Sequence, residues 1–70
     1  MRYAIVIEKA ETNFSAYVPD LPGCIATGES IEEAEWLIHE AIVLHIEGMR
    51  GDRIPAPVPQ SQVEYIEIAA

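Results

Sequence analysis

The fold is decided by one stretch of the sequence, Tyr17-Val18-Pro19-Asp20-Leu21-Pro22-Gly23-Cys24. Its two prolines fix the backbone angle φ, and Gly23 permits a positive φ. The stretch therefore predicts a rigid turn that ends one strand and begins the next.

Strand-forming residues lie on both sides of this turn. Residues 14–18 and 24–27 are rich in β-branched or aromatic side chains, and residues 3–7 are similar. The polar residues 9–13 separate the first of these segments from the second. The first part of the chain is therefore predicted to form a three-stranded meander.

A helix is predicted to follow directly. Gly28 breaks the third strand, and Ser30 with Glu33 forms a capping box, in which each side chain binds the other residue's backbone N–H. The helix is expected to run from residue 31 to residue 50. Gly51 is expected to take the left-handed conformation that ends it.

The segment after the helix predicts a return to the sheet. Pro55, Pro57 and Pro59 favour an extended connector, and residues 63–68 have the composition of a strand. The order is then β-β-β-α-β, with the helix as the crossover to a parallel last strand. Residues 1–70 are expected to form a single α/β domain of the α+β kind.

The helix pattern separates a core arc from an acidic side. The core arc consists of Ile31, Ala34, Leu37, Ile38, Ala41, Ile42, Leu44 and Met49. Glu32, Glu40 and Glu47 lie opposite, and Trp36 and Val43 fall among them. Because aromatic side chains anchor many interfaces and nearby charges steer association, we expect these five residues to contact a partner.

Charge and composition limit the kind of partner. The chain carries 4 Lys and Arg against 12 Asp and Glu, a net charge of −8, which repels nucleic acid and favours a basic protein. Both faces of the first strand are apolar, so a homodimer or higher oligomer is also expected. The sequence has no apolar run long enough for a membrane span, and its start is unlike a signal peptide, so we expect a cytoplasmic protein.

Residues 17–24, followed by Thr27-Gly28 and by Ser30-Ile31-Glu32-Glu33-Ala34, resemble the signature of the HicB antitoxin family. The structural positions of this signature are Pro19, Asp20, Pro22, Gly23, Gly28, Ser30 and Glu33. The resemblance implies a truncated ribonuclease H-like sheet with one helix packed on one face. It also implies that the chain neutralises a small basic HicA-type toxin, which cuts messenger RNA, by covering its catalytic surface.

Many members of that family continue into a DNA-binding segment, whereas this sequence stops at Ala70, so we expect no direct DNA binding. The contact surface around Trp36 is then open to two readings, another copy of this chain or the toxin.

Two alternatives remain beside this hypothesis. The first is a metal-dependent nuclease, for which Glu8, Glu40 and Glu64 would have to converge. The second is an oligomeric binding module without a toxin. We expect no catalytic or cofactor-binding residue, because acidic side chains on so acidic a chain are more often solvated surface. We also expect no metal-binding residue, because His39 and His45 point in different directions on the helix. Cys24 is expected to be a small buried side chain.

Overall fold

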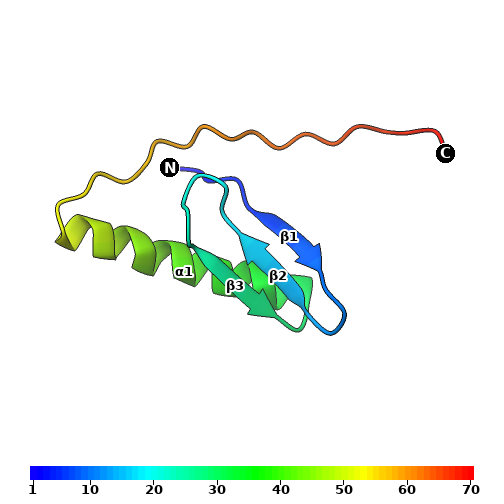
Figure 1. Ribbon diagram of the computed structural model, residues 1–70, viewed down its shortest axis with the longest axis horizontal. Coiled ribbons are helices and arrows are strands. Elements are labelled where there is room, and N and C mark those ends of the chain that lie inside the picture. Colours follow the sequence, from blue (N-terminus) through cyan, green and yellow to red (C-terminus); the bar gives the residue numbers. More distant parts are fainter.

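A computed structural model describes residues 1–70. Three strands precede one helix, in the order β1 (Val6–Lys9), β2 (Phe14–Tyr17), β3 (Ile25–Gly28) and α1 (Ile31–Gly51). β2 lies between β1 and β3 and pairs antiparallel with both. Figure 1 shows α1 lying across one face of the sheet. The predicted meander, the single helix and the α+β class are confirmed.

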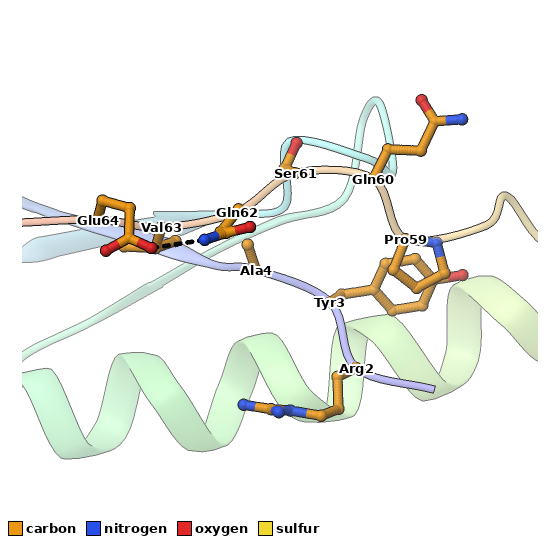
Figure 2. A pocket seen from close by; sticks show the side chains of 9 residues that line it. All are labelled: Arg2, Tyr3, Ala4, Pro59, Gln60, Ser61, Gln62, Val63 and Glu64. Atoms are coloured by element: carbon orange, nitrogen blue, oxygen red, sulfur yellow. Dashed lines mark hydrogen bonds between the residues drawn. The ribbon is translucent and has the colours of Figure 1, made fainter.

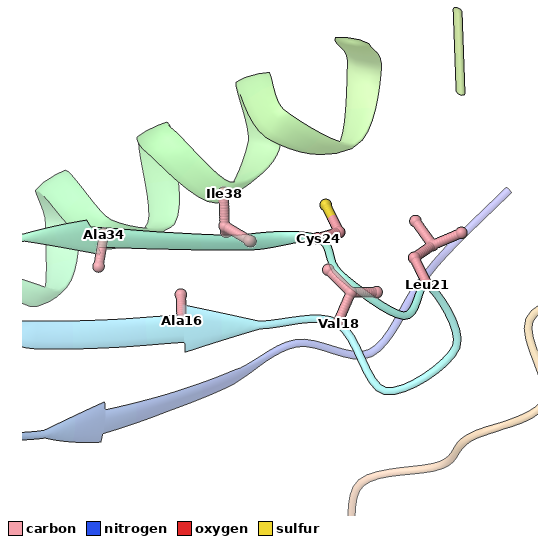
Figure 3. Packing of buried hydrophobic residues seen from close by; sticks show 6 residues of the cluster. All are labelled: Ala16, Val18, Leu21, Cys24, Ala34 and Ile38. Atoms are coloured by element: carbon pink, nitrogen blue, oxygen red, sulfur yellow. The ribbon is translucent and has the colours of Figure 1, made fainter. Parts of the chain in front are cut away.

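The core lies between α1 and the end of the sheet that leads into the turn. Its six buried side chains are Ala16, Val18, Leu21, Cys24, Ala34 and Ile38. Figure 3 shows that two of them come from α1, while the others come from β2 and the turn after it. Half of these side chains are small, so the helix lies close to the sheet.

Gly28 marks the closest approach of strand and helix. A Cβ atom at this position would lie 2.7 Å from the backbone nitrogen of Ala34, which is closer than real Cβ contacts allow. β3 can therefore pass the first turn of α1 only with a glycine here.

Both ends of α1 carry specific caps. The Ser30 hydroxyl accepts a hydrogen bond from the Glu33 N–H at 3.1 Å, as predicted. The Glu33 carboxylate accepts from the N–H of Glu29 at 2.9 Å, whereas the sequence pattern predicted the N–H of Ser30. The expected left-handed Gly51 is also wrong. The helix continues to Gly51, and the positive φ, 59°, occurs at Arg53.

The predicted core arc is broader than the observed one. Only Ala34 and Ile38 of α1 are buried, and Leu44 is 68% exposed. A four-residue strand spans about 13 Å, whereas a 21-residue helix spans about 32 Å. The second half of α1 therefore extends past the sheet, and nothing covers Leu44.

The predicted last strand is absent from the fold of the single chain. We name residues 63–68 the tail segment. They are exposed and belong to no sheet. Figure 1 shows this part of the chain leaving the molecule at an angle to β1. The prediction of a last strand is wrong for the single chain, because strand-forming composition does not determine whether a sheet edge lies within hydrogen-bonding reach.

Candidate functional site

The acidic face of α1 is the first candidate site, and we define it by Trp36, Val43, Glu32, Glu40 and Glu47. All five side chains are exposed. Trp36 is 62% and Val43 40% exposed, although both are large and apolar. Helical spacing places these residues along one side of α1, away from the sheet. The structure thus brings the predicted residues onto one continuous surface.

Leu44 extends this surface, and the sequence pattern missed it. It follows Val43 directly and lies one helical turn after Glu40, so its exposed side chain adds to the apolar part of the face. Periodicity assigned it to the core because the pattern carries no information on where the sheet ends. His39 Nδ1 lies 3.6 Å from Glu40 Oε2, an exposed pair that is ionic only when the histidine is protonated.

The turn after β2 is the second candidate, because the sequence signature lies here. The N–H of Leu21 donates to the Val18 carbonyl, and the N–H of Cys24 donates to the Leu21 carbonyl, each at 3.1 Å. Gly23 has a φ of 84°, as a turn glycine can. Cys24 is buried, as expected, and its burial raises the pKa of the thiol above its usual value. A raised thiol pKa makes this cysteine a poor nucleophile.

Asp20 in the same turn holds the far end of the chain, which sequence reasoning did not anticipate. Its carboxylate accepts hydrogen bonds from the backbone N–H groups of Gln60 and Ser61 and from the Ser61 hydroxyl, each at 2.9 Å. These hydrogen bonds, led by the one from the Ser61 N–H, hold the pKa of Asp20 below its ordinary value. We call this contact the Asp20 clamp.

A second contact guides the same segment past the N-terminus. The Tyr3 hydroxyl donates a hydrogen bond to the carbonyl of Pro57. Figure 2 shows residues 59–64 passing beside residues 2–4. An open hollow of about 560 Å³ lies between them. Arg2 and Glu64 are the charged side chains in its lining. The two contacts fix where the chain runs before the tail segment begins.

The carboxylates do not form a catalytic cluster. No group of three or more His, Cys, Asp or Glu side chains is placed to hold a metal ion, and Glu8, Glu40 and Glu64 do not come together. α1 does not combine the length and the apolar composition that a membrane-spanning helix requires. The arrangement of the described side chains supports binding through exposed apolar and acidic surfaces.

The chain is similar to a described family over nearly its whole length. Residues 3–69 match the family model described as HicB_like antitoxin of bacterial toxin-antitoxin system. A UPF0150 protein of Helicobacter pylori is 45% identical over 65 residues, which cover 91% of this chain and 90% of that protein.

Two longer relatives match as well. Antitoxin HicB 2 of Photorhabdus laumondii is 31% identical, over 100% of this chain and 51% of its own length. An uncharacterized 14.9 kDa protein of Haemophilus phage HP1 is 41% identical, over 94% of this chain and 50% of its own length. The chain thus spans about half the length of these two relatives.

A solved structure is similar in fold. A chain from a structure described as the HicA3 and HicB3 toxin-antitoxin complex superposes with a TM-score of 0.73 and 32% sequence identity. The match covers 86% of this chain and 70% of the other.

Proposed function

Because this chain belongs to the HicB-like antitoxin family, we propose that it binds a small basic HicA-type toxin and covers the toxin's catalytic surface. The observation that carries this proposal is the similarity to a chain from a HicA3 and HicB3 complex. In this proposal the chain is an inhibitor and performs no catalytic step. Its site of action is the cytoplasm, where a toxin that cuts messenger RNA would act.

The acidic face of α1 supports the proposal by its chemistry. Trp36 and Val43 offer apolar contact area, and the three glutamates around them attract a basic surface. With a net charge of −8, the whole chain adds to that attraction. Long-range attraction between opposite charges accelerates encounter and weakens as salt screens it. Binding should therefore combine a salt-sensitive association rate with a dissociation rate set by the apolar contacts.

The proposal predicts that a small basic protein is encoded beside this chain, and the direct test is binding to that protein. Trp36→Ala should weaken binding about 30-fold, the loss of an interface anchor worth about 2 kcal/mol. Ile25→Ala is the matched control, because Ile25 is similarly exposed, at 68%, but lies on the face of the sheet away from α1. It should change binding less than about 3-fold, within the range of residues outside an energetic centre.

Three outcomes would count against the proposal. The first is that the neighbouring protein does not bind. The second is that the toxin cleaves RNA equally well with the chain present, and the third is that association is independent of salt. Equal losses for the Trp36 and Ile25 variants would contradict the placement of the contact on α1. The purified chain alone should not cleave RNA with Mg²⁺ or Mn²⁺, and cleavage lost on Glu8→Gln or Glu64→Gln would favour the nuclease instead.

We also propose that the chain associates with itself and that residues 1–70 do not bind DNA. The net charge supports the second point, because phosphate binding requires cationic side chains. Two exposed apolar surfaces support the first point. One is the sheet face away from α1, with Val6, Tyr17 and Ile25, and the other is the tail segment. Sedimentation of the chain with and without labelled operator DNA would test both points.

A further inference from the structure

The outer edge of β1 has no partner strand. β1 pairs with β2 on one side, and no strand lies on its other side. The unpaired N–H and C=O groups of such an edge readily bind another extended segment. The edge carries no proline, and residues 6–9 include only Glu8 and Lys9 as charges, whose signs cancel. It is thus open to strand addition.

The core is open along the same edge. α1 packs mainly against β3 and β2, so it leaves the helix-facing side chains of the N-terminal stretch partly uncovered. A groove of about 470 Å³ lies between that stretch and α1, and Tyr3, Ile5, Ile42 and Ile46 contribute to its lining. A fourth strand beside β1 would place alternate side chains over this groove.

The chain contains a segment suited to that position. Val63-Glu64-Tyr65-Ile66-Glu67-Ile68 has strand-forming side chains on both faces of an extended backbone. Side chains alternate between the two faces of a strand, so whichever face of the tail segment is turned to the groove presents two apolar side chains. These are Val63 and Tyr65 on one face, and Ile66 and Ile68 on the other. Tyr65 is 93%, Ile66 81% and Ile68 75% exposed in the single chain. Such a concentration of exposed apolar side chains usually marks a contact.

The segment does not reach the edge of its own β1. The Asp20 clamp and the bond from Tyr3 to Pro57 hold the chain just before the tail segment, and from there it diverges from β1 (Figure 1). Hollows separate it from the N-terminal stretch and from Ile5, Ile7 and Phe14 (Figure 2 shows the first). One copy therefore presents a free strand and a free edge that do not meet.

We propose that the tail segment of one copy pairs with the outer edge of β1 in a second copy, and that the exchange is reciprocal. Two copies related by a two-fold axis then satisfy both free strands and both free edges, so the assembly closes at a dimer. The apolar side chains of the exchanged strand complete the core of the partner beside Ile42 and Ile46. This inference does not depend on toxin binding, because it concerns β1 and the tail segment, whereas the toxin proposal concerns the acidic face of α1.

Light scattering during size-exclusion chromatography of the full chain tests the proposal. The chain should elute at twice its 7.8 kDa mass. Ile66→Pro should elute at the mass of one copy, because proline cannot donate to a strand ladder. Ile66 is exposed in the single chain, so the helical circular dichroism of this variant should be retained. Ile25→Ser is the matched control and should remain dimeric.

A monomeric parent chain would overturn the proposal, and so would a dimer that survives Ile66→Pro. Loss of the dimer on Ile25→Ser would assign the contact to the uncovered sheet face instead. Isotope-filtered nuclear Overhauser spectra of mixed labelled and unlabelled copies supply a second readout. They should show contacts between the tail segment of one copy and β1 of the other, and contacts between the two tails alone would overturn the exchange.

Discussion

Replacing Gly28 with alanine should destabilise the domain by about 2 kcal/mol or more, at the upper end of the cost of overpacking a core. The new Cβ would lie 2.7 Å from Ala34 N, 3.0 Å from the carbonyl carbon of Glu33 and 3.1 Å from Ala34 Cα. All three atoms belong to the backbone, so no side chain can rotate away. Either β3 or the first turn of α1 has to move.

This cost is large for a chain of 70 residues. A domain of this size has a net stability of about 3 to 5 kcal/mol, so the variant should retain only about 1 to 3 kcal/mol. Gly48→Ala is the matched control, because Gly48 lies in α1 with nothing within 4 Å of its Cβ position. Alanine there should stabilise the domain by about 0.5 to 1 kcal/mol. The two substitutions are chemically identical and should have opposite signs.

Urea unfolding followed by far-ultraviolet circular dichroism measures both effects. For a slope of about 1 kcal/mol per molar urea, the midpoint should fall by about 2 M for Gly28→Ala and rise by less than about 1 M for Gly48→Ala. A Gly28→Ala variant as stable as the parent chain would refute the close approach of β3 to α1. Equal shifts for both variants would show that alanine acts through helix propensity or the unfolded chain alone.

Three further substitutions test other contacts. The pKa of Asp20 is lowered, so the Asp20 clamp should be fully formed above the ordinary pKa of 3.8 and should be lost as pH falls through the lower pKa of the folded chain. The amide resonance of Ser61 should therefore titrate below pH 3.8, and it should not titrate in Asp20→Asn. Arg53→Gly should raise the urea midpoint, because it relieves a left-handed φ of 59° worth about 1 kcal/mol, and an unchanged midpoint would contradict this. Ile38→Ala should cost about 2 to 5 kcal/mol in the same assay, since Ile38 is 1% exposed, and a cost below about 1 kcal/mol would place it outside the core.

The sequence was sufficient where the determining interactions are local. The turn at residues 17–24, the Ser30 cap of α1 and the meander all depend on neighbouring residues, and the structure contains each of them. The α+β class follows from these elements. The exposure of Trp36 and Val43 was also predictable, because helical periodicity alone separates them from the core arc.

The misses have a common physical cause, which is distance along the chain. Leu44 was assigned to the core because the periodicity of a helix gives no information on how far the sheet extends along it. The tail segment was assigned to a sheet because strand composition does not specify a partner. Asp20 was assigned to turn chemistry alone, although its hydrogen bonds reach residues 40 and 41 positions further along.

The Asp20 clamp also has a consequence for the order of folding. The strand pairs and α1 are complete within residues 6–51, whereas the contacts that guide the tail segment join residues 40 to 54 positions apart. Contacts between residues so far apart form later than local ones, because the intervening loop has to close first. The tail segment should therefore be positioned after the sheet and α1 have formed, so its capture by a neighbouring copy should become faster as the concentration of the chain rises.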